Sequence, residues 1–563
     1  MSKINEYSLG LDFGTNSVRA LVLNLRTGEE TASAEAFYPS GEAGVLTSGN
    51  PHLARQNPDD YRKCLLTVVP SVLDKAREDH HFCPEAVIGI GVDATGSSPL
   101  PVDKCAAPLA FQKRFADNLD AQVWLWKDHT SSEEAEIITR LAQKLRPQYL
   151  DKYGGSYSSE WFFSKIWRCL NVNPDVFQAA WTWVELADYI PALLTGCDDA
   201  SQIKRGACAA GHKAMFNKEW GGLPDRSFLT RIHPEIGKLR DRLFDSVLTS
   251  DRPVGFLSPE WAEKLGVRPG IPVAAGALDA HLGAVGSGIG KGVLVKIIGT
   301  STCDILVSPR GKKIRDIPGM SGIADGSVLP GITGIEAGQS AVGDIFNWFV
   351  SQVCRGDESL HEELSKKASN LHPGESGLLA LDWNNGNRSV LVDYRLTGLL
   401  VGQTLHTGRE EIYRALIEAT AFGARIIIER MEDFGVKIDR IINCGGIAEK
   451  NPLVMRIYAD VLERPMEISA SLQTCALGAA IMGGAAGRGE TGTTAVRSLQ
   501  DIACRQKTQI FSPKKKEGRI YDDLYMLYRR LHDAFGRRGR GKSLFPVMKE
   551  LLKVKKKSVE LFS

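Results

Sequence analysis

The residue types most able to do chemistry gather in one stretch, residues 276–304. Asp279 follows the apolar run 271–275, so its carboxylate is expected at the end of a strand. The segment 283–292 is rich in glycine and is expected to bend. A strand-like run, 293–298, then ends in a Gly-Thr-Ser-Thr turn. An acid, a bend and a polar turn in so short a stretch favour a site at a junction between domains.

A second Gly-Thr turn lies near the N-terminus. It reads DFGTNS over residues 12–17, and alternating apolar residues on both sides predict a β-hairpin. Residues 295–307 repeat this pattern around a Gly-Thr-Ser turn. Glycine lets backbone amides approach an anion, and Thr and Ser hydroxyls can donate to phosphate oxygens. One such hairpin alone is at least as well explained as a structural turn, but two of them predict a duplicated architecture that binds phosphate.

Two further stretches have the residue types of a sugar site. The apolar run 86–92 ends at Asp93, Ala94, Thr95 and Gly96, and α/β folds place ligand contacts at such strand ends, although a plain β-turn fits as well. In the stretch 123–129, Trp124 and Trp126 alternate. One ring should therefore face the core and the other could face a cleft, where Trp126 could stack on a sugar, with core packing as the more common fate of a Trp. Lys127 or Asp128 would then bond hydroxyls.

Three later features complete the set of candidates. Lys213 follows the small-residue loop 205–212, and Glu336 lies in so apolar a setting that it needs a partner or a ligand. A strand at 438–443 leads into CGGIAEKN, residues 444–451. Glycines at such a strand-to-helix turn let a base or a phosphate lie against the backbone, with a tight turn as the alternative.

Composition sets the class of protein. The chain has 563 residues, a net charge of +2 and 24% charged residues, which indicates a globular protein of more than one domain without nucleic-acid partners. No apolar run reaches the roughly 18 residues that a membrane span needs, and residues 1–8 lack the core of a signal peptide. The 11 cysteines contain no CxxC pair, which predicts reduced thiols in the cytoplasm and argues against zinc.

Periodic segments indicate an α/β chain around these motifs. Helical apolar spacing predicts helices over 59–77, 131–145 and 410–432. From residue 537 the sequence becomes basic, with apolar residues on one helical side between 544 and 552. This end is either a solvated tail or a basic amphipathic helix.

Taken in order, DFGT, GALDAH, IGTST, CGGIAEKN and ALGAA resemble the FGGY family of carbohydrate kinases. That family shares the fold of the actin and hexokinase superfamily. Within it, VWLWKDHT, GGSYSSEWF, AGHK, GIEAGQSAVGDI and ATAFGAR are similar to the members that phosphorylate L-ribulose. The similarity covers roughly residues 7–535.

The resemblance implies two α/β, RNase-H-like domains with a catalytic cleft between them. Residues 1–287 would bind sugar and supply the base, residues 288–536 would bind ATP, and residues 537–563 would form a basic tail. The implied reaction is ATP-dependent phosphorylation of L-ribulose to L-ribulose 5-phosphate in L-arabinose catabolism. The alternatives are a kinase of D-ribulose, xylulose or ribitol, and an actin-like nucleotide switch. A homodimer is an open alternative to a monomer.

The resemblance also implies the site residues. Asp279 would be the general base, with Mg²⁺ near Asp12 and Asp279, directly or through water. Gly96 is expected to widen the sugar pocket by a methyl group. The implied sugar contacts are Thr95, Gly96, Trp126, Lys127, Lys213 and Glu336. The implied nucleotide contacts are Asp12, Gly14, Thr15, Asn16, Ser17, Gly299, Thr300, Ser301, Gly445, Gly446 and Asn451.

Overall fold

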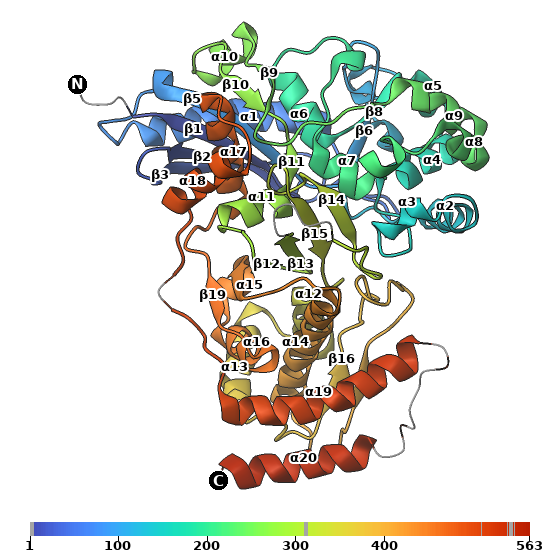
Figure 1. The fold of residues 1–563 in the computed structure, drawn as a ribbon, viewed down its shortest axis with the longest axis vertical. Coiled ribbons are helices and arrows are strands. Elements are labelled where there is room, and N and C mark those ends of the chain that lie inside the picture. Colours follow the sequence, from blue (N-terminus) through green and yellow to red (C-terminus); the bar gives the residue numbers. More distant parts are fainter. Residues whose placement is uncertain are drawn as a thin grey trace.

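The chain folds into two α/β lobes, one above the other along the long axis of the molecule (Figure 1). The computed structural model describes residues 5–308, 314–507, 509–537, 539, 544 and 547–562. Strands from the first half of the chain build the upper sheet, and strands from the second half build the lower one. No helix in this described part is long and apolar enough to cross a bilayer.

The upper sheet has the strand order β3-β2-β1-β5-β10-β9, and β11 pairs with β5. β1 runs antiparallel to β2 and parallel to β5, which continues in parallel to β10. Its strands are β1 (Tyr7–Phe13), β2 (Ser17–Asn24), β3 (Glu30–Phe37), β5 (Val87–Ala94), β9 (Pro253–Phe256), β10 (Pro272–Ala274) and β11 (Ala277–Leu278).

The lower sheet repeats this topology. Its order β15-β13-β12-β18-β19 has the same sequence of antiparallel and parallel pairings as β3-β2-β1-β5-β10. The duplication predicted from the two Gly-Thr turns is therefore confirmed. The strands are β12 (Val293–Ile298), β13 (Thr302–Val307), β14 (Gly322–Asp325), β15 (Thr333–Ala337), β18 (Arg440–Cys444) and β19 (Met466–Ile468).

Helices cover both sheets and add a helical subdomain to the upper lobe (Figure 1). The predicted helices are present as α1 (Pro58–Ala76), α2 (Ser132–Leu145) and α14 (Arg409–Asp433). The subdomain around α2 has its own apolar core. Its other main helices are α4 (Phe162–Val172), α5 (Pro174–Ala179), α7 (Ala207–Lys213), α8 (Arg226–Ile232) and α9 (Pro234–Leu239). The lower lobe has α12 (Gly343–Trp348), α13 (Glu358–Ser369), α15 (Gly446–Lys450), α16 (Pro452–Leu462) and α19 (Lys515–Gly536).

One helix of the second half packs on the upper sheet. α17 (Thr474–Arg488) lies against β1 and β5 (Figure 1). A side chain at Gly91 on β5 would collide with the backbone of Ala479, so only glycine allows the helix to come this close. The boundary that we propose between residues 287 and 288 separates the two sheets, and α17 crosses back over it.

The glycine-rich segment 283–292 does not bend along its whole length as expected. Its first part lies in α11 (Asp279–Gly286), where a side chain at Gly286 would collide with the backbone of Thr474. These glycines therefore serve close packing of α11 on α17. The chain turns only after the helix, at Gly288 and Gly292, whose φ angles are 84° and 75°.

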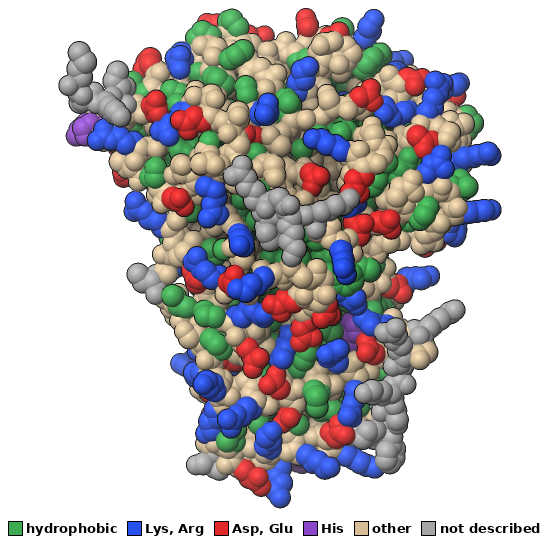
Figure 2. All heavy atoms as spheres, viewed as in Figure 1, with side chains coloured by type: hydrophobic (Ala, Val, Ile, Leu, Met, Phe, Trp, Pro, Cys, Tyr) green, Lys and Arg blue, Asp and Glu red, His purple; other side chains and the backbone are tan. Residues whose placement is uncertain are grey.

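The basic C-terminal segment forms a packed helix, which agrees with the basic amphipathic helix that the sequence left open and contradicts the solvated tail. α20 (Val547–Phe562) runs beside α19 (Figure 1), with Val547, Leu551 and Val554 buried in the lower core. Its lysines are among the basic side chains that gather at the lower end of the molecule (Figure 2). Residues 538, 540–543, 545–546 and 563 of the predicted tail lie outside the described residues.

The packing of α20 predicts different effects for two neighbouring leucines. Leu551 is 1% exposed and Leu552 is 64% exposed. We expect Leu551→Ala to lower the free energy of unfolding by about 2–5 kcal/mol, because it leaves a cavity. Leu552→Ala should change it by no more than about 0.5 kcal/mol. Denaturant titration of both variants measures the difference, and equal effects would show that α20 does not pack as described.

Candidate active site

The N-terminal hairpin forms as predicted at the end of β1. The Gly14 N–H donates to the Ser17 carbonyl at 3.0 Å and closes the turn. The Thr15 hydroxyl accepts from the Trp126 indole N–H at 3.0 Å, which ties this turn to the predicted sugar residue. The Ser17 hydroxyl donates to Glu35 at 2.6 Å and is used within the sheet, while Asn16 is exposed. The Asn16 side-chain amide donates to the Ala43 carbonyl at 2.5 Å, so Gly14 and Thr15 are the residues of this turn that remain available to an anion.

The second hairpin joins β12 and β13. The Gly299 N–H donates to the Ser301 carbonyl at 3.0 Å, as in the first turn. The Thr300 carbonyl accepts from the Val342 and Asp344 N–H groups at 2.8 and 3.1 Å, so the turn also holds the start of α12. Gly299 and Thr300 border a large groove in the lower lobe.

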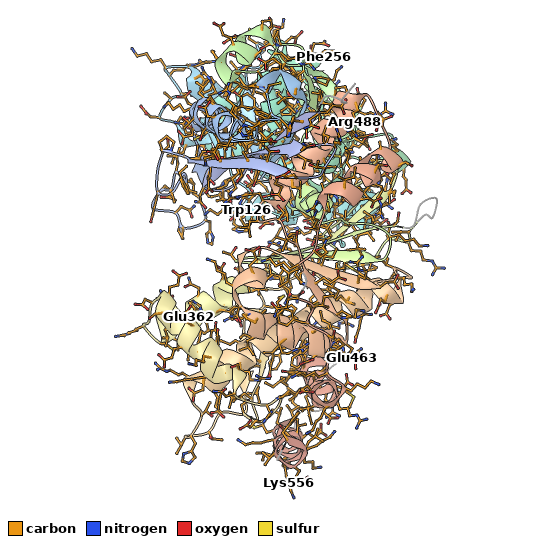
Figure 3. The ribbon with its side chains drawn as sticks, turned by 90° about the vertical axis from the view of Figure 1, so that its left-hand side faces the viewer. Trp126, Phe256, Glu362, Glu463, Arg488 and Lys556 are labelled. Carbon is orange, nitrogen blue, oxygen red and sulfur yellow. The ribbon has the colours of Figure 1, made fainter. Side chains whose placement is uncertain are left out.

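That groove has a volume of about 1260 Å³, and the predicted nucleotide residues that line it are Gly299, Thr300, Gly446 and Asn451. Gly445 has a φ of 94°, and a Cβ there would come within 2.6 Å of the Ile298 carbonyl. Gly446 borders open space, so its backbone faces the groove. Asn451 also lines the groove, and its side chain caps α16. Figure 3 shows Glu362, which lines this groove, on the lower lobe and Trp126 on the upper lobe. The groove is large enough for a nucleotide.

Three carboxylates converge where the upper strands end. Asp12 and Asp93 are opposite each other on the parallel strands β1 and β5, and Asp279 follows β11, which pairs with β5 at Asp93. Asp93 is fully buried, and neither of its carboxylate oxygens has a hydrogen-bond partner within the described chain. The Arg19 guanidinium lies 3.3 Å from Asp12. One partly exposed arginine leaves an excess of negative charge, which suits a divalent cation with oxygen ligands.

Burial and mutual repulsion explain the electrostatics of this group. Burial, and then the charge of Asp12, raises the pKa of Asp279 to about 7. Burial also raises the pKa of Asp12 and, together with the charge of Asp12, the pKa of Asp93. Asp279 is thus placed to gain and lose a proton near neutral pH, which a general base requires.

A buried ion pair connects the lobes beside these carboxylates. Lys213 Nζ, at the end of α7, lies 3.0 Å from both carboxylate oxygens of Glu336 on β15. Burial alone would raise the pKa of Glu336, but the Lys213 ammonium holds it well below its usual range. Burial alone would likewise lower the pKa of Lys213, but the charge of the Glu336 carboxylate raises it. Both groups are charged at neutral pH, and a charged pair of this kind can hold the hydroxyls of a polyol.

A second ion pair between the lobes lines a small cavity that the Lys213–Glu336 pair also lines. The cavity has a volume of about 60 Å³, and Gly96, Trp126, Lys213 and Glu336 are among its lining residues. Glu160 from the upper lobe and Arg388 from the lower lobe also line it, and Arg388 Nη2 lies 3.8 Å from Glu160 Oε1. Sequence reasoning gave neither residue a role, although Glu160 lies in the GGSYSSEWF stretch.

Three of the predicted sugar residues differ from expectation. Thr95 is buried and shares a hydrogen bond of 3.0 Å with Ser98, and Lys127 is exposed, so neither lines the cavity. Gly96 does line it, but a methyl group there would collide with the Leu278 side chain. The expectation that Gly96 widens the pocket is therefore wrong, because Leu278 fills the space.

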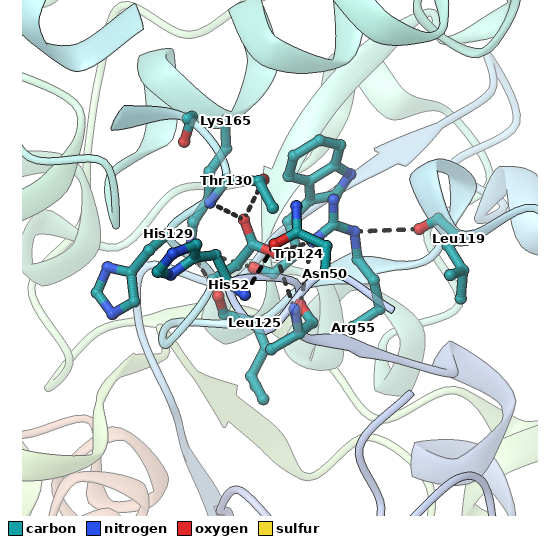
Figure 4. A network of polar contacts seen from close by, with 12 residues as sticks. Asn50, His52, Arg55, Leu119, Trp124, Leu125, His129, Thr130 and Lys165 are labelled. Carbon is teal, nitrogen blue, oxygen red and sulfur yellow. Dashed lines mark hydrogen bonds and ion pairs between the residues drawn. The ribbon is translucent and has the colours of Figure 1, made fainter. Parts of the chain in front are cut away.

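A buried polar network around Arg55, Trp124 and Thr130 lies in the loop that carries Trp126 (Figure 4 shows the network). Trp124 is fully buried and Trp126 reaches the cavity, as their alternation predicts. Asp128 accepts from the Ala54 N–H at 2.8 Å, from Thr130 and from Arg55, whose guanidinium stacks 3.4 Å over Trp124. The Asp128 carboxylate is thus fully used in the fold, which leaves no role for it in binding hydroxyls.

Lys165 is a further residue that the sequence did not reveal. Its ammonium is buried and donates to the Ser97 and Leu125 carbonyls, both at 2.8 Å, so it fixes the two loops that carry Gly96 and Trp126 (Figure 4). Burial lowers the pKa of Lys165 to about 8. Lys165 lies within an aromatic-rich helix, which gave no local sign of this role.

Comparison with known families and proteins gives matches along nearly the whole chain. The profile of the FGGY family of carbohydrate kinases, N-terminal domain, matches residues 7–286, and the profile of its C-terminal domain matches residues 294–487. A ribulokinase of Shouchella clausii is 40% identical over 551 residues, which are 95% of this chain and 96% of that protein. A ribulokinase of Mycolicibacterium smegmatis is 38% identical, with 94% of each chain covered.

Solved structures share the same architecture. A xylulose kinase from Rhodospirillum rubrum superposes with a TM-score of 0.75 at 21% identity, covering 94% of this chain and 98% of that one. A glycerol kinase from Plasmodium falciparum, solved with ADP, gives a TM-score of 0.73 at 15% identity, covering 94% and 98%. At these identities the likeness concerns the fold, which agrees with the two related sheets described above.

Proposed function

This chain belongs to the FGGY family of carbohydrate kinases, and on that premise we propose that it transfers the γ-phosphoryl group of ATP to L-ribulose. The products are L-ribulose 5-phosphate and ADP, as in L-arabinose catabolism. The relatives named ribulokinase support the substrate class. The observation that carries the proposal is the buried Lys213–Glu336 pair between the lobes, in a cavity that also holds Trp126.

In the proposed reaction, Asp279 accepts the proton of the sugar hydroxyl that attacks phosphorus. The proton can leave late, as the new phosphorus–oxygen bond forms and the bond to ADP breaks. Lys213 and Glu336 bind other hydroxyls of the sugar, and Trp126 packs against its carbon face. Positioning of this kind makes the attack effectively unimolecular.

Backbone groups of the two hairpins would bind the phosphates. Gly14 and Thr15 face them from the upper lobe, with Gly299 and Thr300 opposite, while Gly445, Gly446 and Asn451 border the space for the adenosine. Mg²⁺, when bound with the nucleotide, would neutralise phosphate charge. The carboxylates of Asp12 and Asp279 would hold it, directly or through water, with the buried Asp93 carboxyl, which has no hydrogen-bond partner within the described chain, beside them.

The raised pKa of Asp279 predicts the pH dependence of the reaction. A base must be ionised, so activity is present above its pKa and lost as the pH falls through it. With a pKa raised to about 7, kcat/KM for the sugar should fall about tenfold per pH unit below neutrality. The residual activity of Asp279→Asn should lack this acidic limb. A wild-type profile that stays flat down to pH 5 would rule out Asp279 as the titrating base.

Release of ADP, measured with a coupled assay, tests the proposed substrate. The assay compares L-ribulose with D-ribulose, xylulose, ribitol and glycerol at saturating ATP and Mg²⁺. We expect the highest kcat/KM for L-ribulose. A higher kcat/KM for xylulose or glycerol would show that the protein is a sugar kinase with another substrate. ADP release that does not depend on any sugar would contradict both the substrate and the assignment as a sugar kinase.

A further inference from the structure

Two buried histidines face the carboxylate that the proposed function assigns to the sugar. His212 Nδ1 lies 3.4 Å from Glu336 Oε2, and His281 Nε2 lies 3.7 Å from the same oxygen. The two imidazole rings are 4.4 Å apart, centroid to centroid. No ring nitrogen of either histidine has a hydrogen-bond partner in the described part of the chain. Buried polar groups without partners call for an explanation.

The fold makes specific room for these rings. Glu336 on β15 pairs with Gly322 on β14, and a side chain at Gly322 would collide with the His212 ring. The glycine thus opens a slot in the sheet directly opposite Glu336, and His212 fills it. His281 comes from α11, two residues after Asp279. The histidines therefore connect Glu336 with two helices. One is α7, which ends at Lys213, and the other is α11, which begins at Asp279, the proposed base.

We propose that His212 and His281 are positioning residues that fix the carboxylate of Glu336 for sugar binding. This rests on the proposed function, which makes Glu336 a sugar contact. Each ring presents one nitrogen to Oε2 without forming a hydrogen bond, and a neutral imidazole that carries its proton on that nitrogen turns its N–H dipole toward the carboxylate. Lys213 bonds both oxygens of the same carboxylate from another side. The contacts from Lys213, His212 and His281 together restrict the orientation of the Glu336 carboxylate.

The same three side chains satisfy the geometry of a metal site, since their ligand atoms lie within 4.8 Å of one another. A transition metal bound there would share Glu336 with the Lys213 ammonium, which already lies 3.0 Å from both oxygens. The ammonium supplies the positive charge that the carboxylate needs, and a divalent cation beside it would be strongly repelled. The charges therefore favour positioning over metal binding.

Substitution of His212 separates positioning from a purely structural role. We expect His212→Leu to raise the KM for the sugar at least tenfold, with the KM for ATP within twofold. His212→Asn places an N–H near the position of Nδ1 and should recover most of the sugar affinity. A loss of stability that changes both KM values equally, or an Asn variant no better than Leu, would overturn the proposal.

Two further variants test whether the histidines act through Glu336. Gly322→Ala changes no polar group but displaces the His212 ring, so it should reproduce the rise in sugar KM. In a Glu336→Gln background, His212→Leu should have less than a threefold additional effect, because the carboxylate that it positions is gone. Full additivity of the two changes would contradict action through Glu336.

A measurement without sugar keeps this inference separate from the proposed function. Nitrogen NMR of labelled histidines should show the His212 and His281 ring signals shifting between wild type and Glu336→Gln, whatever the substrate is. Unchanged signals would overturn the positioning role even if L-ribulose is phosphorylated. Calorimetry with Zn²⁺ alone should show no binding that depends on these histidines. Micromolar Zn²⁺ binding that His212→Asn and His281→Gln both abolish would replace positioning with a metal site.

Discussion

Asp279→Asn is expected to bind sugar and ATP as the wild type does and to lose on the order of 10² or more in kcat. The amide keeps the shape of the side chain but cannot accept the proton of the attacking hydroxyl. Its position supports this role, because Asp279 follows β11 beside Asp12 and Asp93, and burial with the charge of Asp12 raises its pKa to about 7. Calorimetry for binding and steady-state kinetics for turnover measure the two effects separately.

A capping role for Asp279 predicts the opposite pattern. α11 begins at Asp279, and Oδ1 accepts the Ala280 N–H at 2.7 Å, so the carboxylate also serves the helix. Asparagine provides the same acceptor, and helix N-termini tolerate either residue. The thermal midpoint of Asp279→Asn should therefore stay within a few degrees of wild type, which makes a loss of kcat specific to chemistry. Turnover within tenfold of wild type would move the assignment to Asp12.

Glu336→Ala should raise the KM for the sugar by about 10–100-fold, with the KM for ATP nearly unchanged. The variant removes a charged acceptor for sugar hydroxyls and leaves the buried Lys213 ammonium without its partner, which is the costly half of such a change. In this variant the Lys213 ammonium, which no longer bonds Glu336, would also bind small anions. Initial rates at varied sugar and varied ATP measure the two KM values.

Another ion pair between the lobes supplies a matched control. Lys152 of the upper lobe bonds Asp316 of the lower lobe, outside the sugar cavity. Asp316 is 40% exposed in its side chain, and the buried Lys152 ammonium keeps Glu219 at 3.5 Å, so the loss of Asp316 should cost little. We expect Asp316→Ala to leave the sugar KM within twofold. Equal increases in Glu336→Ala and Asp316→Ala would mean that any contact between the lobes matters and that Glu336 has no special relation to the sugar.

Local sequence patterns were sufficient to predict the positions of residues whose role depends only on the turn or strand end in which they lie. The Gly-Thr turns, the strand before Asp279 and the alternation of Trp124 and Trp126 are short-range features, and the structure places each as predicted. The duplicated sheets also followed from the two similar hairpins, because each hairpin lies at the first strand of its sheet.

The residues that sequence reasoning missed depend on contacts between distant segments. Glu160 meets Arg388 only after the lobes have assembled. Asp93 was expected at a strand end, but its place opposite Asp12 depends on the parallel pairing of β1 and β5. Gly96 appeared to enlarge the pocket because nothing in the local sequence shows that Leu278 fills its space. Likewise, the sequence left a solvated tail and a basic amphipathic helix both open, and only the packing of α20 beside α19, with Leu551 in the lower core, decides between them.

The most direct test of the account is a structure of the protein with L-ribulose and a non-hydrolysable ATP analogue. We expect the 5-hydroxyl within about 2.6–3.2 Å of the Asp279 carboxylate, between that carboxylate and the γ-phosphate. We also expect Lys213 and Glu336 to contact other hydroxyls of the sugar, and the adenine to lie in the groove beside Gly446. A sugar bound with its 5-hydroxyl turned away from Asp279, or bound outside the cavity of Trp126, Lys213 and Glu336, would contradict it.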